Sequence, residues 1–170
     1  MRIAMIGTGY VGLVSGACLS EFGHDVICID KDAAKVDALR AGQIPIFEPG
    51  LDDVVAANVK AGRLSFASDL ADAVKNAEAV FIAVGTPSRR GDGHADLTYV
   101  FAAAEEIAKH LSGYTTVITK STVPVGTSRK VKEIIARTRP DAAFDVCSNP
   151  QFLREGSAIG DFRKPDRVVV

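Results

Sequence analysis

The sequence is poor in the residues that build disulfide frameworks and zinc sites. Its three cysteines are far apart and lack CxxC spacing: Cys18, Cys28 and Cys147. This pattern argues against disulfide bonds and metal ligation, and it is typical of a reducing compartment. We therefore expect each cysteine to be a small buried residue, and we expect no bound metal.

Long apolar runs and a strong net charge are also missing. No run approaches the roughly 20 residues that a membrane-spanning helix needs. The glycines of MRIAMIGTGYVG interrupt the first apolar stretch before the core of a signal peptide develops. A formal net charge of −1 provides no general attraction to nucleic acid or to an acidic membrane. We expect a cytoplasmic protein that binds neither nucleic acid nor membrane.

Apolar residues make up 47% of the 170 residues and charged residues 24%, which is typical of a globular domain. This length fits one domain, residues 1–170, with a sizeable core. The final DRVVV has the pattern of a new strand, so we expect the sequence to be a fragment of a longer protein.

Short apolar runs rich in Val, Ile and Phe alternate with helical patterns along the chain. Six runs predict strands that are covered on both faces: Arg2–Ile6, Val26–Ile29, Leu64–Ala67, Ala79–Ala83, Thr116–Thr119 and Phe144–Cys147. Helices are predicted at 11–22, from Asp32 to about Arg40, at 97–111 and at 128–138, with Gly23, Asp32, Asp96 and Thr127 as caps. The alternation predicts an α/β fold, a doubly wound, mostly parallel Rossmann sheet with helices on both faces.

In such sheets, ligands bind beyond the carboxyl ends of the strands. The stretches that follow five of the predicted strands are unusual: 7–12 (GTGYVG), Asp30, 84–93 (VGTPSRRGDG), 120–127 (KSTVPVGT) and 148–158 (SNPQFLREGSA). Glycines, prolines, hydroxyls and lone charges therefore concentrate at one edge of the sheet. This edge is the predicted binding cleft.

The first stretch is a dinucleotide-binding fingerprint. Gly7 permits a tight turn, Gly9 lets the backbone approach a pyrophosphate, and Gly12 lets the helix pack closely on the sheet. Asp30 ends the next strand, where a carboxylate accepts hydrogen bonds from an adenosine ribose. Since that carboxylate would repel a 2′-phosphate, the pattern favours NAD over NADP.

Other residues along this edge are weaker candidates. Lys35 can reach the adenosine end of a cofactor or can be an ordinary solvated lysine. Thr86 can narrow the cleft beneath the nicotinamide ribose or can belong to a simple turn. Thr122 can hold a water molecule or a substrate group. Arg89 and Arg90, in a Gly-rich loop, can contact a phosphate or a neighbouring subunit.

An amide and a carboxylate, Gln151 and Glu155, follow the sixth strand. If this stretch opens a helical turn, their spacing of four puts both side chains on one face. The alternative is a solvated loop at the start of a helix.

Several segments together resemble the N-terminal domain of the UDP-glucose/GDP-mannose dehydrogenase family: residues 1–39, PIFEPGL, VGTP, DGHADLTYV, KSTVPVGT and SNPQFLREGSAI. The resemblance covers the whole chain. It implies oxidation of the C6 alcohol of a nucleotide sugar, with UDP-glucose converted to UDP-glucuronate by two NAD, by way of a thioester on a cysteine. It also implies a homodimer formed through chain beyond residue 170.

The resemblance assigns roles to residues of this chain. NAD would contact Gly7, Gly9, Tyr10, Val11, Gly12, Asp30, Lys35, Thr86, Thr122 and Glu155. The nucleotide sugar would lie against Gln151, Phe152, Leu153, Arg154 and Glu155. The catalytic candidates are Thr122, which would help to position water, Gln151 and Glu155.

This chain departs from the family in two respects. None of its three cysteines matches the motif of the family's nucleophile, which lies in the C-terminal half, so we expect the 170 residues alone to be inactive. The family has Asn-Pro-Glu-Phe-Leu where this chain has Gln151. A glutamine keeps hydrogen bonds but cannot take a proton, which predicts an impaired step or reliance on Glu155.

Other functions remain open at this point. GDP-mannose or an N-acetylated UDP-sugar is an alternative substrate within the family. A non-enzymatic Rossmann nucleotide sensor would not need KSTVPVGT or SNPQFLREG. A hydroxyacyl-CoA dehydrogenase would need a catalytic His–Glu pair that is not evident.

Overall fold

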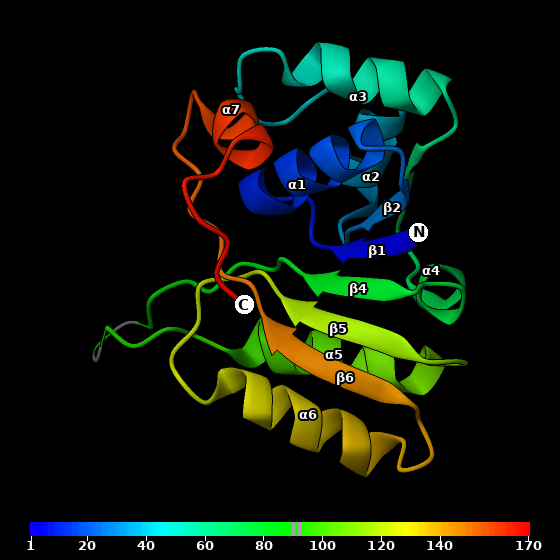
Figure 1. Cartoon of the computed structure of the whole chain (residues 1–170), viewed down its shortest axis with the longest axis vertical. Helices are drawn as coiled ribbons and strands as arrows, with labels where there is room; N and C mark the ends of the chain where they lie inside the picture. Colours follow the sequence, from blue (N-terminus) through cyan, green and yellow to red (C-terminus); the bar gives the residue numbers. More distant parts are fainter. Residues whose placement is uncertain (90, 92) are drawn as a thin grey trace.

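The computed structural model describes residues 1–89, 91 and 93–170, so Arg90 lies outside the described residues. Within them, six parallel strands form one sheet in the order β3-β2-β1-β4-β5-β6 (Figure 1). The strands are β1 (Arg2–Ile6), β2 (Asp25–Ile29), β3 (Leu64–Ala67), β4 (Ala79–Ile82), β5 (Thr115–Thr119) and β6 (Phe144–Ser148). All six predicted strands are confirmed. The order reverses between β1 and β4, which is the point where doubly wound sheets bind ligands.

Seven helices occur in the described residues: α1 (Tyr10–Glu21), α2 (Ala33–Arg40), α3 (Leu51–Lys60), α4 (Ala71–Lys75), α5 (Thr98–His110), α6 (Thr127–Thr138) and α7 (Ala158–Arg163). Helices α1, α2, α5 and α6 confirm the four predicted ones within two residues at each end. Helices α3, α4 and α7 were not predicted.

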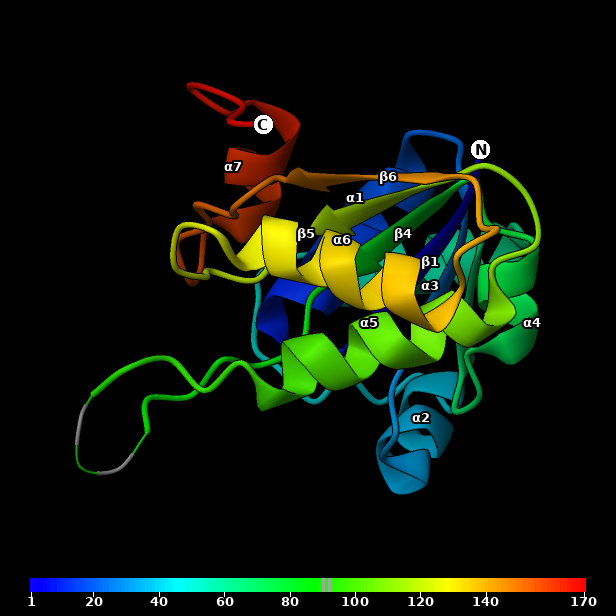
Figure 2. The same cartoon turned by 90° about the horizontal axis from the view of Figure 1, so that it is seen from below.

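The sheet separates two apolar cores, and alternate residues of β1 point into each of them. Ile3 and Met5 belong to one cluster, with residues of α1, α3 and α7. Ala4 and Ile6 belong to the other, with residues of α4, α5 and α6. Figure 2 shows α5 and α6 side by side against the sheet. Burial on both faces explains why the central strands β1, from Ile3 on, and β4 are continuously apolar, whereas the edge strands β3 and β6 contain exposed Ser65 and Asp145.

Two of the predicted helix caps are confirmed and two differ. Gly23, at φ +93°, follows the end of α1, and the Asp32 carboxylate accepts the Lys35 backbone N–H at the start of α2. Asp96 accepts the N–H of Thr98 at 2.9 Å, but Leu97 occupies the N-cap position of α5. Thr127 is the first residue of α6, which Gly126 precedes in a left-handed conformation, so its prediction as the cap was wrong.

Of the two alternatives left open for the stretch at Gln151, the structure shows a loop before a helix rather than a helical turn. Residues 151–154 lie outside helices and strands, residues 155–157 form a turn, and α7 begins only at Ala158. Gly156 interrupts the segment with φ +83°, a left-handed conformation that glycine adopts readily. Gln151 and Glu155 therefore do not share a helix face.

The cysteine prediction holds for two of the three residues. Cys18 and Cys28 are completely buried, but Cys147 in β6 is partly exposed. Burial raises the pKa of Cys18 to about 11 and that of Cys28 to about 12. Both thiols are thus protonated at neutral pH and are poor nucleophiles. In the part of the chain that the structure describes, no helix is long and apolar enough to cross a membrane.

Candidate functional site

The glycine turn between β1 and α1 lies where the order of the strands reverses. Gly7 has φ +104°, and a Cβ atom there would lie 2.6 Å from the Ala83 carbonyl oxygen. A Cβ atom on Gly12 would lie 2.0 Å from the Gly7 carbonyl oxygen. Both positions therefore require glycine, as the fingerprint predicts.

Gly9 has a different environment. No heavy atom among the described residues lies within 4 Å of an added Cβ atom, so the space in front of its backbone is open. Gly9 is also the N-cap of α1, and the first turn of this helix contains no acidic residue. The helix start therefore presents backbone N–H groups and a positive dipole end, which are the features that bind a pyrophosphate.

Asp30 follows β2 at the same edge. Its Oδ2 accepts hydrogen bonds from the Thr8 backbone N–H at 3.0 Å and the Thr8 hydroxyl at 2.6 Å. Partial burial raises the pKa of this carboxyl, but hydrogen bonds from Thr8, Asp32 and Lys35 outweigh that effect and hold the pKa at about 2. Asp30 is therefore ionised at neutral pH. A carboxylate has about four acceptor positions, so it can also accept bonds from a ribose.

Lys35 lies against Asp30. Its Nζ is 3.2 Å from Asp30 Oδ2, and the exposed fractions of the two side chains are 26% and 20%. Lys35 is thus paired with Asp30 at the end of β2. Its contact with the adenosine end of a cofactor stays a prediction.

The loops that follow β4 and β5 contact one another. The Thr86 hydroxyl donates to the Thr122 carbonyl at 3.1 Å, while the side chain of Thr122 is exposed. The Ser121 hydroxyl donates to the Val84 carbonyl at 2.7 Å. These bonds hold the two threonine candidates together at the carboxyl ends of neighbouring strands.

A cavity of about 620 Å³ lies beyond the ends of β5 and β6. Its lining includes three of the predicted sugar-side residues: Gln151, Phe152 and Arg154. Leu153 instead packs against an apolar core, and Glu155 is exposed in the turn before α7. The structure therefore brings part of the predicted set to one cavity and separates the remainder from it.

Lys120 in the same cavity was not predicted as a site residue. It is 5% exposed, its Nζ donates to Asn149 Oδ1 at 2.7 Å, and the amine lies 5.6 Å from the centroid of the Phe162 ring. Burial lowers the pKa of Lys120 to about 8. Such an amine can gain or lose a proton close to neutral pH. The signal in the sequence was a lysine directly after the buried run TTVIT.

Gln151 and Arg154 differ in how their polar groups are used. Among the described residues, the buried Gln151 Oε1 has no hydrogen-bond partner. The Arg154 guanidinium is bidentate on Asp161, with distances of 3.1 and 2.7 Å, and this pair lowers the pKa of Asp161 to about 2. Asp161 thus satisfies the Arg154 guanidinium, whereas the Gln151 amide oxygen is left unsatisfied by the described residues.

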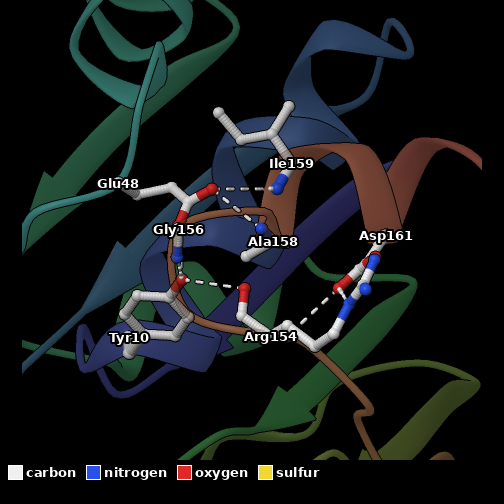
Figure 3. A network of polar contacts seen from close by, with 7 residues as sticks. All are labelled: Tyr10, Glu48, Arg154, Gly156, Ala158, Ile159 and Asp161. Carbon is white, nitrogen blue, oxygen red and sulfur yellow. Dashed lines mark hydrogen bonds and ion pairs between the residues drawn. The ribbon is translucent and has the colours of Figure 1, made fainter.

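Tyr10 and Glu48 connect the glycine turn to the loop of the cavity (Figure 3). The Tyr10 hydroxyl donates to Glu48 Oε2 and lies 3.5 Å from the Arg154 carbonyl oxygen. Burial and the bond to Glu48 raise the pKa of Tyr10 to about 12. Tyr10 was predicted to contact NAD, whereas its hydroxyl points toward the segment that precedes α7. Glu48 belongs to the PIFEPGL segment of the family resemblance, and the sequence analysis predicted no role for it.

Comparison with known proteins adds to this geometry. The family model described as "UDP-glucose/GDP-mannose dehydrogenase family, NAD binding domain" matches residues 1–170. A UDP-glucose 6-dehydrogenase of Rhizobium meliloti (strain 1021) is 65% identical over 170 residues, which are 100% of this chain and 39% of that protein. A UDP-glucose 6-dehydrogenase of Bacillus subtilis (strain 168) is 51% identical over 99% of this chain and 37% of that protein.

Solved structures of nucleotide-sugar dehydrogenases also match nearly the whole chain. A ternary complex of GDP-mannose dehydrogenase from Pseudomonas aeruginosa has a TM-score of 0.94 and 39% identity, covering 99% of this chain and 40% of that one. A UDP-glucose dehydrogenase from Pyrobaculum islandicum has a TM-score of 0.93 and 44% identity, covering 98% of this chain and 39% of that one. The chain thus spans about two fifths of the length of these four relatives.

Proposed function

This chain belongs to the UDP-glucose/GDP-mannose dehydrogenase family, and on that premise we propose that it is the NAD-binding domain of a longer UDP-glucose 6-dehydrogenase. The whole enzyme would oxidise UDP-glucose to UDP-glucuronate with two NAD. One observation carries the proposal: the glycine turn and the cavity beyond β5 and β6, which Lys120 and Gln151 line, lie at the same edge of the sheet. Support also comes from the relatives at 65% and 51% identity, which are UDP-glucose 6-dehydrogenases.

The cofactor is NAD, which would supply a hydride acceptor for each of the two oxidation steps. The open backbone at Gly9 and the start of α1 would hold its pyrophosphate, and Asp30 its adenosine ribose. Thr86 and Thr122 would lie at the nicotinamide end, because their loops follow the strands next to the glycine turn. The cofactor would then extend from β2 toward the cavity.

The nucleotide sugar would enter the cavity against Gln151, Phe152 and Arg154. The Gln151 amide can orient a hydroxyl or a water molecule but cannot take a proton. We propose that proton transfer in the hydrolytic step relies on Glu155 or on water held by Thr122, which follow β6 and β5 next to the cavity but do not line it. Lys120 would add positive charge to the wall that faces the sugar.

The nucleophilic cysteine would lie beyond residue 170. Cys18 and Cys28 have raised pKa values and are buried, which supports excluding them from this role. The 170-residue chain alone should therefore bind NAD and produce no sustained NADH. We also propose that the full-length protein is a cytoplasmic homodimer formed through the remaining chain.

The test has two parts. Calorimetric titration of the 170-residue chain should give binding of NAD and weaker binding of NADP. The full-length enzyme should then reduce NAD with UDP-glucose and show a lower kcat/KM with GDP-mannose or an N-acetylated UDP-sugar. Failure to bind NAD would refute the domain assignment, and preference for another nucleotide sugar would refute the substrate.

A further inference from the structure

Glu48 is a buried carboxylate between α2 and α3, with 6% of the residue exposed. It accepts hydrogen bonds from the Tyr10 hydroxyl and from the backbone N–H groups of Gly156 at 2.8 Å, Ala158 at 2.8 Å and Ile159 at 3.4 Å (Figure 3). Burial raises the pKa of this carboxyl, but these bonds outweigh it and the pKa lies below its ordinary value. Glu48 is therefore ionised, and its oxygens are occupied by groups of the protein itself.

The donors come from two segments that are far apart in the sequence. Tyr10 directly follows Gly9 and is 38 residues from Glu48, whereas Gly156 is 108 residues away. The Gly156 N–H also lies 3.2 Å from the Tyr10 hydroxyl oxygen. One carboxylate thus connects the glycine turn to the segment that precedes α7.

That segment continues into the wall of the cavity. The Ser157 N–H donates to the Arg154 carbonyl at 3.0 Å, and the Arg154 N–H donates to Asp161 Oδ2 at 2.9 Å. Neither bond involves Glu48. Both nevertheless depend on a backbone path that the bonds to Gly156 and Ala158 hold in place. A change at Glu48 can therefore move Gln151 and Arg154, which line the cavity.

We infer that Glu48 is a positioning residue that holds segment 151–158 in a fixed relation to the glycine turn, and so holds the sugar site against the cofactor site. It is not a catalytic residue, because protein donors occupy its carboxylate oxygens. Its effect on turnover rests on the proposed function, whereas its effect on the position of the segment does not.

The decisive variant is Glu48→Gln in the full-length protein. An amide nitrogen would face donors that now meet a carboxylate oxygen, so at least one of the four bonds is lost. Misplacement of reacting groups by about 1 Å can reduce rate about 100-fold. We expect kcat/KM for UDP-glucose to fall about 10- to 100-fold, with the dissociation constant of NAD within about twofold of wild type. Rates are normalised to the folded fraction, so a loss of stability alone does not change them.

The matched control is Glu21→Gln. Glu21 binds Arg163 at 2.9 and 2.5 Å and so also ties α7 to α1, but it does not contact Gly156. We expect this variant to keep kcat/KM within about twofold of wild type. If Glu48→Gln does not fold, Tyr10→Phe tests the same connection, because it removes one donor and leaves the three backbone bonds in place. We expect that variant to reduce kcat/KM as well, by a smaller factor.

Hydrogen exchange supplies a readout that is independent of activity. The amides of Arg154 and Ser157 do not bond to Glu48, yet we expect them to exchange at least tenfold faster in Glu48→Gln than in Glu21→Gln. Unchanged exchange at these two amides, or the same kcat/KM in Glu48→Gln and the control, would overturn the inference. If wild type does not oxidise UDP-glucose, the proposed function fails, and the exchange comparison still decides the role of Glu48.

Discussion

Replacing Asp30 by Asn should weaken NAD binding and reduce the preference for NAD over NADP. The substitution keeps the shape of the side chain and removes its charge. A hydrogen bond to a charged acceptor contributes about 1.5–3 kcal/mol, and about 1.4 kcal/mol corresponds to a tenfold change in affinity. We therefore expect the dissociation constant of NAD to rise roughly 10- to 100-fold. NADP should lose less affinity, because the charge that opposes its 2′-phosphate is removed.

The same substitution has a pH-dependent effect on stability. The carboxyl pKa of Asp30 is lowered from 3.8 to about 2 by folding. A group with a depressed pKa stabilises the folded state above its unfolded pKa and loses that contribution as the pH falls through its folded pKa. The shift corresponds to about 2 kcal/mol. The free energies of unfolding of wild type and Asp30→Asn should therefore differ more at pH 6 than at pH 2.

Calorimetric titration with NAD and NADP tests the binding, and urea denaturation across this pH range tests the linkage. Asp37→Asn is the control, since Asp37 is a carboxylate on α2 whose side chain is 72% exposed in its pair with Arg40. It removes the same charge from the same region without contacting the glycine turn. Equal NAD affinity in the two variants would show that Asp30 does not bind the cofactor.

Three further predictions concern the glycine turn and the cavity. Gly9→Ala should keep the thermal midpoint of wild type, since its Cβ atom meets no described atom within 4 Å, but should weaken NAD binding at least tenfold. Gly7→Ala should unfold at a clearly lower temperature, because at φ +104° its Cβ atom would lie 2.6 Å from a carbonyl oxygen. Equal midpoints for Gly7→Ala and wild type would refute this. Lys120 should titrate near pH 8 when the dimethylated lysines are followed by NMR, and titration together with the exposed lysines would contradict this. Relative to Lys120→Met, the wild type should gain stability between pH 8 and 10.5, because in this range the unfolded state binds the proton that the folded state has lost. In the full-length enzyme, Gln151→Glu should raise overall turnover about 10²–10⁴-fold with little change in NAD affinity, as expected for a restored acid–base group. If pre-steady-state traces of wild type and Gln151→Glu have equal slow phases, residue 151 is not the acid–base group, and that role passes to Glu155 or to water held by Thr122.

The sheet and the cofactor turn could be predicted from the sequence because their signals are local. A strand that is covered on both faces is a continuous apolar run, and the spacing of Gly7, Gly9 and Gly12 lies within six residues. The position of Asp30 follows from the parallel strand order. Each of these features depends on near neighbours in the chain or on one general rule of α/β folds.

The three missed helices are less determined by their own sequences. Helices α4 and α7 have five and six residues, lengths at which packing rather than propensity stabilises a helix. Helix α3 begins after Gly50, which has φ +80°, and the Pro-Gly pair in front of it looks like a turn. At Gln151 the spacing of four was compatible with a helical turn, but residues 151–154 form a loop and α7 begins only at Ala158.

Glu48 and Lys120 were missed as site residues because charged residues are expected at the surface. Their burial depends on partners that are distant in the sequence: Gly156 is 108 residues from Glu48, and Asn149 is 29 residues from Lys120. Periodicity and motif spacing contain no information about such pairs. For Lys120 the usable signal is a charged residue directly after a buried strand, whereas Glu48, between α2 and α3, has no such signal.

These two buried charges have opposite electrostatic outcomes, and the difference indicates their roles. Glu48 is surrounded by donors that favour its charged form, so its pKa falls below the ordinary value and its charge persists at any pH near neutrality. Lys120 has one hydrogen-bond acceptor, Asn149, and lies over the Phe162 ring, and these contacts compensate its desolvation only in part. Its pKa therefore falls to about 8, which corresponds to a destabilisation of the charged form by about 3 kcal/mol. A permanent, fully bonded charge suits an anchor for the backbone, whereas a charge that is only partly compensated beside an open cavity is available to an anionic or polar ligand. The sugar site would thus combine one fixed support, Glu48, with one group whose charge responds to its surroundings, Lys120.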